Sequence, residues 1–306
     1  MAPALPRIMG ILNVTPDSFS DGGRHADPVA AGMALREAGA DIIDVGGEST
    51  RPGATPVPLE EELRRTIPVV AALSNAGVAV SIDTMKAEVM RQALAAGAVM
   101  LNDVTALAGD PDSLSVAAAG TADVVLMHMP GNPQTMQGLA RYDDPAAEVI
   151  AALQRRIAVA EAAGIARGRI IADPGIGFGK ALAHNLDILR RLEAFRVLGV
   201  PLLLGASRKS LIPGVAGPAP VEDRLPGSLA IALRGAEAGV AWLRVHDVAE
   251  TRQALALWAA MRPEAGSAGT ARLRGADARR TLPGRDEERE WMNVDQSQGR
   301  AGTAGS

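Results

Sequence analysis

The sequence predicts an α/β fold, a (β/α)8 TIM barrel that forms a single domain and is followed by a disordered C-terminal tail. Aliphatic, strand-like runs alternate with amphipathic helical stretches from residue 8 to about residue 261. Eight strand-then-helix units within about 250 residues match the size of a closed barrel. A doubly wound open sheet is the alternative, but that fold usually has fewer units.

The low aromatic content favours the same fold class. Only 2% of the 306 residues are aromatic, so the core must consist of small and branched aliphatic side chains. Parallel strands that are buried on both faces are continuous aliphatic runs of this kind. The predicted strands are Ile8–Leu12, Asp41–Val45, Val78–Ile82, Met100–Leu101, Val124–Met127, Ile170–Ala172, Pro201–Leu204 and Ala241–Val245.

Amphipathic stretches rich in Ala, Arg and Glu separate these strands. The clearest predicted helices are Pro28–Ala38, Leu59–Leu73, Lys86–Ala96, Pro145–Ala163 and Asp187–Glu193. A glycine often follows a helix, where it adopts the left-handed turn at low cost. The glycines predicted to do so are Gly39, Gly77, Gly97, Gly120, Gly164, Gly199 and Gly239.

The composition changes near Pro263. Residues 263–306 are rich in Gly, Ala, Arg and Glu and show almost no aliphatic periodicity. Such a segment buries too little apolar surface to offset the entropy of ordering it. We therefore expect a catalytic barrel domain over residues 1–262 and a disordered polar tail over residues 263–306.

Charge and composition exclude several classes of function. The formal net charge is -4 and the basic residues form no block, which argues against a nucleic-acid partner. The absence of cysteine excludes disulfides and thiolate metal sites. No stretch approaches the roughly 20 apolar residues of a membrane span, and no signal peptide is recognisable. We expect a cytoplasmic protein without nucleic-acid or membrane partners.

Cationic and polar groups follow the last two predicted strands. Ser207-Arg-Lys-Ser210 comes after one of them, and Arg244-Val-His-Asp247 covers the end of the other. Side chains at the carboxyl ends of barrel strands form the active site in this fold. Two arginines, a lysine and a histidine there predict a phosphate-like or carboxylate-like ligand.

Carboxylates and an amide end three further strands. Asp83, Asn102 and Asp173, with Lys209, form a set of donors and acceptors suited to a flat, amide-rich heterocycle. A carboxylate accepts two parallel hydrogen bonds from an amino-imino edge, as it does from a guanidinium group. For Asp103 and Asp110 we expect only the capping of the next helix.

Other chemistries are not supported by the pattern. Asp173-Pro-Gly-Ile-Gly-Phe-Gly-Lys180 resembles a phosphate loop, but that motif needs Gly at 174 and Ser or Thr at 181. Ser207 lacks an obvious base partner, which argues against a nucleophilic serine. His128 is either a ligand contact or a hydrogen-bonded structural histidine, and no histidine cluster has zinc spacing.

Five motifs in register resemble the dihydropteroate synthase family. They span about residues 7–261 and are Met9–Gly23, Asp44–Gly53, Asp173–Lys180, Ser207–Ser210 and Arg244–Asp247. The resemblance implies that 6-hydroxymethyl-7,8-dihydropterin pyrophosphate and p-aminobenzoate condense to 7,8-dihydropteroate and pyrophosphate. This is a step of folate synthesis and a sulfonamide target. The family pattern also implies a homodimer, formed through the last helices.

The resemblance assigns site residues by position. Asp83, Asn102, Asp173 and Lys209 would hold the pterin, and Asn13 would bind Mg²⁺. Asp17, Thr50, Arg51 and Lys209 would be catalytic, the first three on two mobile loops. The pyrophosphate would be held by Asn13, Thr50, Arg51, Arg244 and His246. The p-aminobenzoate would be framed by Phe19, Pro52, Phe178, Ser207 and Lys209.

Two alternatives remain at this point. A methyltetrahydrofolate-binding methyltransferase shares the pterin-binding barrel, but it needs neither the Arg244 and His246 anion site nor the Ser-Thr-Arg-Pro loop. A non-catalytic pterin-binding paralogue is the second, and turnover would exclude it. Ile212-Pro-Gly214 departs from the family pattern, which puts the local loop in doubt.

Overall fold

The computed structural model describes residues 5–15, 27–50 and 54–262. The predicted site residues Asp17, Phe19, Arg51 and Pro52 lie outside the described residues. So do His25 and the whole predicted tail, residues 263–306.

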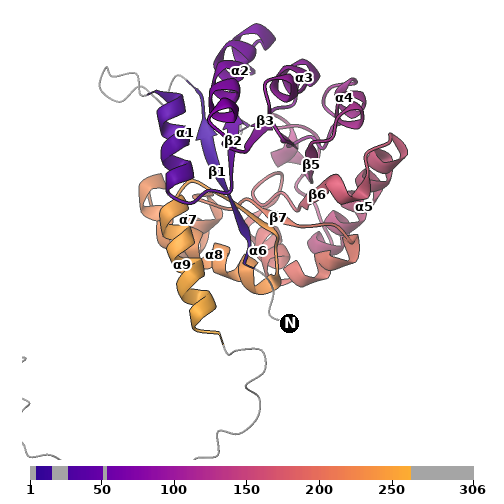
Figure 1. Ribbon diagram of the computed structural model, residues 1–306. Helices are drawn as coiled ribbons and strands as arrows, with labels where there is room; N and C mark the ends of the chain where they lie inside the picture. Colours follow the sequence, from indigo (N-terminus) through magenta and orange to yellow (C-terminus); the bar gives the residue numbers. More distant parts are fainter. Residues whose placement is uncertain (1–4, 16–26, 51–53, 263–306) are drawn as a thin grey trace, which may run out of the picture. The chain divides into compact units, whose positions relative to one another are not determined.

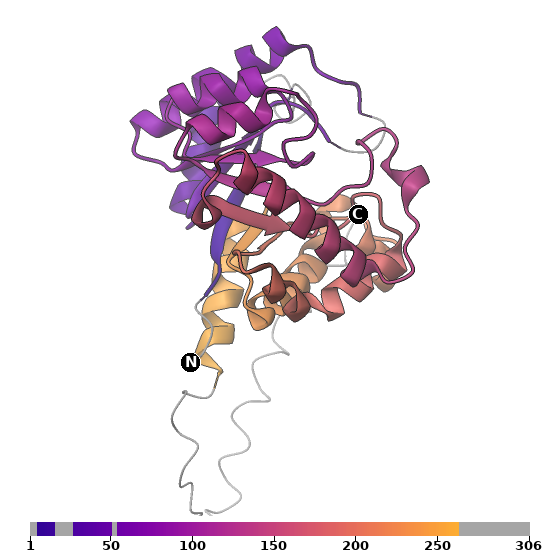
Figure 2. The same ribbon diagram turned by 90° about the vertical axis from the view of Figure 1, so that its right-hand side faces the viewer.

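Within the described residues, eight parallel strands form one sheet with the order β6-β5-β4-β3-β2-β1-β8-β7 (Figure 1). A single parallel bridge between Ala172 and Leu202 joins the two ends of this order. At that junction the amide of Ala172 donates to the carbonyl of Pro201 at 2.9 Å. The sheet therefore closes on itself, and helices surround it in Figures 1 and 2. The predicted (β/α)8 barrel is confirmed.

The strands end slightly later than their aliphatic runs. Asp83, Asp103 and Asp173 each still belong to a strand, because their backbone groups continue the parallel ladder. The strands are β1 Arg7–Asn13, β2 Ile42–Gly46, β3 Val80–Asp83, β4 Met100–Asp103, β5 Asp123–Met127, β6 Ile170–Asp173, β7 Leu203–Leu204 and β8 Trp242–Val245.

The helices begin at recognisable signals. Asp27 and Asp144 cap two of them through their carboxylates, and each is followed by a proline at the first helical position. The α-helices are α1 Pro28–Glu37, α2 Leu59–Asn75, α3 Ala87–Ala95, α4 Ser113–Ala119, α5 Pro145–Ala162, α6 Leu182–Arg190, α7 Leu211–Ala216, α8 Leu225–Ala238 and α9 Val248–Ala260. Short 3-10 helices are η3 Met136–Leu139, η4 Arg167–Arg169, η5 Leu192–Leu198 and η6 Val221–Arg224.

Three local predictions need correction. The predicted strand Pro201–Leu204 is shorter in the structure, where β7 is Leu203–Leu204. The predicted helix Asp187–Glu193 is split between α6 and η5, where Leu192, Phe195 and Leu198 are buried at the three-residue spacing of a 3-10 helix. Gly120 has a φ of -99°, so it is not a left-handed cap, whereas the other six predicted glycines all have positive φ.

The atypical Ile212-Pro-Gly214 segment lies inside α7. It therefore adds no extra loop at this position.

The core has two layers. Inside the barrel, seven side chains at or just after the strand starts pack together: Met9, Ile42, Met100, Val125, Ile171, Leu203 and Trp242. The second, larger layer lies between the sheet and the helices. The inner layer fills the amino-terminal half of the barrel, so polar side chains gather at the carboxyl end.

None of the described helices is both long enough and apolar enough to cross a membrane.

Candidate active site

The strand register aligns the predicted site residues of the first four strands. Asn13 pairs with Gly46, Gly46 pairs with Asp83, and Asp83 pairs with Asn102. A Cβ added to Gly46 would lie 3.6 Å from Oδ2 of Asp83 and 3.9 Å from Oδ1 of Asn13. The missing side chain at Gly46 therefore leaves room above these two polar groups.

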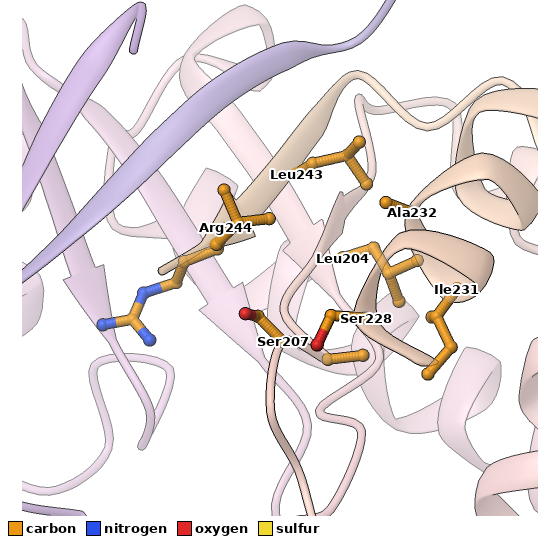
Figure 3. A pocket seen from close by; sticks show the side chains of 9 residues that line it. Leu204, Ser207, Ser228, Ile231, Ala232, Leu243 and Arg244 are labelled. Carbon is orange, nitrogen blue, oxygen red and sulfur yellow. The ribbon is translucent and has the colours of Figure 1, made fainter. Parts of the chain in front are cut away.

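Arg244 lies at the centre of the site. Its Nε donates to Oδ2 of Asp44 at 2.6 Å, and its Nη2 donates to Oδ2 of Asp83 at 2.7 Å. Figure 3 shows the guanidinium pointing away from the apolar side chains of Leu243 and Ile231. Burial by itself lowers the pKa of Arg244, but Asp44 and Asp83 more than compensate and raise it. The side chain stays cationic.

Asp44 is a site residue to which the sequence reasoning gave no role. It is fully buried in the middle of β2, and its Oδ2 also accepts from Nδ2 of Asn102 at 2.9 Å. Among the described residues, its Oδ1 has no hydrogen-bond partner. The sequence did contain a signal for Asp44, which is the one charged residue in the aliphatic run Ile42-Ile-Asp-Val45. An Asp in a buried strand needs a charged or hydrogen-bonding partner, so its position indicates a paired carboxylate.

The site carboxylates are destabilised in their charged form. Burial raises the pKa of Asp83 to about 7, against the opposing effect of Arg244, and the charge of Asp44 adds to the rise. Burial also raises the pKa of Asp173, although Lys209 and the amide of Gly175 oppose the shift. Perturbed carboxyl groups that meet at the mouth of a barrel are a mark of a functional site.

Lys209 joins this cluster from the loop after β7. Its Nζ donates to the carbonyl of Ile176 and lies 4.5 Å from the ring centroid of Phe178. Burial lowers the pKa of Lys209 to about 8, while Asp173 opposes the shift. The structure thus brings Lys209, Asp173 and Phe178 together, as the sequence predicted.

The loop after β6 is held by Lys180. Its Nζ donates to the carbonyls of His128 at 3.1 Å, Gly175 at 2.9 Å and Phe178 at 3.0 Å. Three acceptors use all three N–H groups of an ammonium, so Lys180 organises its own loop. This agrees with the rejection of a phosphate loop in this segment.

Ser207 and His246 lie closer than the sequence suggested. Oγ of Ser207 is 3.0 Å from Nδ1 of His246 and accepts from the His246 amide at 3.2 Å. The sequence showed no base partner for Ser207, so this pairing is a correction. It comes from β7 and β8 being neighbours in the sheet.

Arg208 does not join the cationic site. Its guanidinium makes two hydrogen bonds with Asp247, at 3.0 Å through Nε, and its backbone adopts a φ of 57°. Its amide donates to Oγ of Ser228 at 2.9 Å. The expected group of two arginines therefore contains Arg244 but not Arg208.

The aspartates expected to cap helices have related but different roles. Oδ1 and Oδ2 of Asp103 accept from the amides of Thr105 and Leu107, within the loop after β4. Asp110 accepts from the amide of Ala87 at 3.0 Å and so caps α3 rather than the helix that follows it.

His128 is packed against Tyr142, but it is not hydrogen-bonded through Nδ1 as a structural histidine would be: this buried atom has no hydrogen-bond partner among the described residues. Burial, with a further contribution from Lys180, lowers its pKa to about 3. Its ring lies edge-on to that of Tyr142, with centroids 6.1 Å apart. The imidazole is therefore neutral at physiological pH.

The described residues contain no cluster of three or more His, Cys, Asp or Glu side chains that could hold a metal ion. The amide oxygen of Asn13 at the end of β1 is a hard oxygen donor of the kind that Mg²⁺ accepts. Because Mg²⁺ in many enzymes takes its other ligands from water and substrate phosphates, a single protein donor fits such a site.

Thr50 is the last described residue before the gap at residues 51–53.

One cavity lies near the carboxyl ends of the strands, and another lies near their amino ends. The first, of about 10 Å³, lies between β7, β8 and α8 and is lined in part by Ser207, Ser228 and Ile231 (Figure 3). It has room for about one water molecule. The other, of about 90 Å³, is lined by Phe195, Pro201 and Val240 at the amino ends of β7 and β8, away from the site.

The fold and site define a (β/α)8-barrel enzyme whose mouth combines buried carboxylates with cations. The chain matches the family model described as "Pterin binding enzyme" over residues 9–246. It is 51% identical over 254 residues to dihydropteroate synthase of Escherichia coli strain K12, covering 82% of this chain and 89% of that protein. The chain belongs to the pterin-binding enzyme family and, within it, to the dihydropteroate synthases.

Solved structures give the same result. Dihydropteroate synthase of Xanthomonas albilineans with 4-aminobenzoic acid is 52% identical, with a TM-score of 0.79 over 84% of this chain and 93% of that one. The Yersinia pestis enzyme in complex with a sulfonamide drug is 44% identical, also with a TM-score of 0.79, over 84% and 94% of the two chains.

Proposed function

We propose that this protein condenses 6-hydroxymethyl-7,8-dihydropterin pyrophosphate with p-aminobenzoate to give 7,8-dihydropteroate and pyrophosphate. The observation that carries the proposal is the cluster of Asp83, Asn102, Asp173 and Lys209 around Arg244 at the carboxyl ends of the strands. Membership of the dihydropteroate synthases supports the choice of substrates. Relatives that are 46–51% identical to this chain are dihydropteroate synthases, which favours this proposal over the methyltransferase alternative.

The pterin ring binds to the buried carboxylates. Asp173 accepts from the Gly175 amide through one lone pair of Oδ1, which leaves the other lone pair of Oδ1 and the whole of Oδ2 for the two donors of an amino-imino edge. The Asn102 amide is oriented by its bond to Asp44, so its Oδ1 can accept from a ring N–H. Asp83 and Lys209 complete a site for a flat heterocycle.

The pyrophosphate is bound by Asn13, Thr50, Arg51, Arg244 and His246. Nη1 of Arg244 makes neither of the bonds to Asp44 and Asp83 and is the atom we assign to a phosphate oxygen. His246 directly follows the end of β8, two residues after Arg244. Mg²⁺, held through Asn13, would add positive charge next to the leaving phosphates.

The p-aminobenzoate is bound by Phe19, Pro52, Phe178, Ser207 and Lys209. Phe178 and Lys209 already form a cation–π pair that gives this side of the pocket an apolar face and a charge for a carboxylate. Ser207 comes two residues before Lys209 in the same loop after β7.

We propose a dissociative route for the reaction. Arg51, Arg244 and His246 stabilise the negative charge that grows on the pyrophosphate as the C–O bond breaks. Asp17 stabilises the positive charge that remains on the pterin methylene. The arylamine is already neutral at pH 7, so the attack needs no strong general base. The new N–C bond leaves the nitrogen protonated, and this acidic proton is then lost to the released pyrophosphate or to water. Oxygen-isotope scrambling within bound pterin pyrophosphate in the absence of the arylamine is the expected result, and a lack of scrambling would count against this route.

Turnover by the purified protein tests the function. We expect pyrophosphate release and dihydropteroate formation with Mg²⁺ and both substrates, and a loss of both in Lys209→Ala. Pterin binding without turnover would instead identify a non-catalytic paralogue.

Three further properties belong to the same proposal. Sensitivity to sulfonamides is expected from Phe19, Pro52 and Ser207, and growth at high sulfonamide of a strain that depends on this protein would contradict it. A homodimer is supported by two exposed apolar side chains, Leu257 on α9 at 61% exposure and Met261 at the C-cap of that helix at 69%, and light scattering tests it. A cytoplasmic location is testable by cell fractionation.

A further inference from the structure

Three charged side chains meet beside the barrel mouth, outside the substrate contacts proposed above. They are Glu48 in the loop after β2, Glu62 in α2 and Lys86 just before α3. Nζ of Lys86 donates to Oε2 of both Glu48 and Glu62. The Glu62 side chain is fully buried and that of Glu48 is 8% exposed. We refer to these three residues as the Lys86 cluster.

Lys86 is the cation that makes this burial possible. Two carboxylates removed from water are costly unless each is paired and hydrogen-bonded. Burial by itself lowers the pKa of Lys86, but the bonds to Glu48 and Glu62 outweigh it and raise the pKa. Without Lys86, two buried carboxylates would face each other.

One arm of the cluster reaches the end of β3. Oε1 of Glu62 accepts from Oγ1 of Thr84 at 2.6 Å. The Thr84 amide in turn donates to the carbonyl of Asn102 at 3.1 Å. Because Thr84 follows Asp83 directly, this arm fixes the backbone next to a site carboxylate.

The other arm reaches the loop after β2. Glu48 comes two residues before Thr50, which belongs to the proposed pyrophosphate site. The preceding residue, Gly47, is pressed against α2: its carbonyl accepts from Nη1 of Arg65 at 3.0 Å, and an added Cβ would lie 2.7 Å from Cγ2 of Thr66. The path of the chain toward Thr50 is therefore set by contacts with α2.

We propose that Lys86 is a positioning residue for the pyrophosphate site: by holding Glu48 and Glu62 it fixes where the β2–α2 loop leaves the barrel, and with it Thr50. The inference rests on the proposed function, because the pyrophosphate site is part of it. Lys86 acts through Glu48 and contacts no substrate.

A purely structural role makes a different prediction. If the Lys86 cluster only joins α2 to the start of α3, removing Lys86 lowers the melting temperature but leaves the ligand affinity of the folded protein unchanged. If Lys86 positions the loop, the folded protein itself binds pyrophosphate more weakly. Small displacements of binding groups are costly in this way.

The test is a calorimetric titration of the full chain with inorganic pyrophosphate and Mg²⁺. Lys86→Met is expected to bind about tenfold more weakly than the wild type, and Lys86→Arg to regain most of the loss. Arg91→Met is the matched control, since Arg91 pairs with Glu88 on the exposed face of α3. Circular dichroism at the titration temperature gives the folded fraction of each variant.

Glu48 supplies a second, independent readout. Glu48→Gln should weaken pyrophosphate binding to a similar degree, and the double variant with Lys86→Met should be little worse than either alone, because both act through one contact. Unchanged pyrophosphate affinity in folded Lys86→Met, or additive losses in the double variant, would overturn the inference.

The outcomes separate this inference from the proposed function. A wild type that binds pyrophosphate without turnover defeats the proposed activity, while the titrations still decide the role of Lys86. A wild type that turns over, with Lys86→Met unchanged, defeats the inference alone. A wild type that does not bind pyrophosphate defeats both.

Discussion

Oδ2 of Asp83 lies 2.7 Å from Nη2 of Arg244, and this ion pair joins a residue assigned to the pterin with one assigned to the pyrophosphate. The two proposed subsites are thus electrostatically linked before any substrate binds. A negative charge on Asp83 attracts the guanidinium and competes with an incoming phosphate for it. The pair therefore affects the two parts of the substrate in opposite directions.

Asp83→Asn should separate these two effects. We expect the affinity for 6-hydroxymethylpterin to fall about tenfold, because a charged acceptor is lost, and the affinity for Mg²⁺-pyrophosphate to rise by about two- to fivefold. Calorimetric titration with each ligand measures both. Asp123→Asn is the control, since Asp123 is a half-buried carboxylate at the amino end of β5. A parallel change of both affinities would contradict the linkage.

Arg244→Met should destabilise the fold as well as the site. It leaves Asp44 and Asp83 buried without their cation, and removing one partner of a buried ion pair costs about 3–5 kcal/mol. Urea unfolding near neutral pH measures this loss. The loss should shrink in acid, because protonated carboxyl groups no longer need the cation. A loss that is independent of pH would argue that packing, not charge, sets the stability here.

The raised pKa of Asp83 predicts the pH dependence of pterin binding. Its pKa of about 7, against 3.8 for an ordinary Asp, means that the carboxyl is protonated in mildly acidic solution and accepts hydrogen bonds poorly there. Pterin affinity should therefore rise with pH and level off above about 7. The same shift makes the stability contribution of Asp83 largest below 3.8 and lost as the pH rises toward 7.

Titration with 6-hydroxymethylpterin, which carries no phosphate, isolates this effect from the ionisation of pyrophosphate. The rise should flatten in Asp83→Asn. If the acidic limb is unchanged in that variant, the titrating group is Asp173 rather than Asp83.

Lys209 predicts an alkaline limb. Burial lowers its pKa from 10.5 to about 8, so the ammonium that faces Asp173 and the substrates is lost as the pH rises through that value. The second-order rate constant kcat/KM should fall about tenfold per pH unit above the apparent pKa. Lys209→Arg tests the assignment, because an arginine stays charged and should remove the limb even if it lowers the rate. An alkaline limb retained in that variant would point to another group.

The fold could be predicted because each strand is an aliphatic run between turn signals. The strand ends could not be placed to the residue, since Asp83, Asp103 and Asp173 are polar yet remain in the ladder. Polarity marks where a side chain meets the site, whereas a strand ends where backbone pairing stops. The length of β7 was overestimated. Pro201 and Leu202 continue the apolar run, but Pro201 has no N–H to donate and Leu202 forms only an isolated bridge with Ala172.

The site was predictable where function rests on residues at strand ends. It was not predictable where function rests on pairs from distant segments. Asp44 and Arg244 are 200 residues apart, and Ser207 and His246 are 39 apart. Lys86 looked like the start of an ordinary amphipathic helix, and only the folded chain brings Glu48 and Glu62 to it.

Gly175 allows the loop after β6 to pass close to His128, and a substitution there should disrupt the site. Its φ is 66°, and an added Cβ would overlap the carbonyl oxygen of His128. Gly175→Ala should therefore displace the carbonyls that hold Lys180 and move Phe178 away from Lys209. We expect a loss of about 3 kcal/mol or more and at least a hundredfold lower kcat/KM.

Two other glycines separate the causes of this loss. Gly164 has a φ of 99° with nothing within 4 Å of an added Cβ, so Gly164→Ala should cost only backbone strain, about 1–2 kcal/mol, and leave the rate unchanged. Gly168 has neither positive φ nor a close neighbour, and Gly168→Ala should be neutral. Urea unfolding and steady-state kinetics of the three variants decide the matter. If Gly175→Ala behaves like Gly164→Ala in both measurements, the close approach to His128 does not shape the active site.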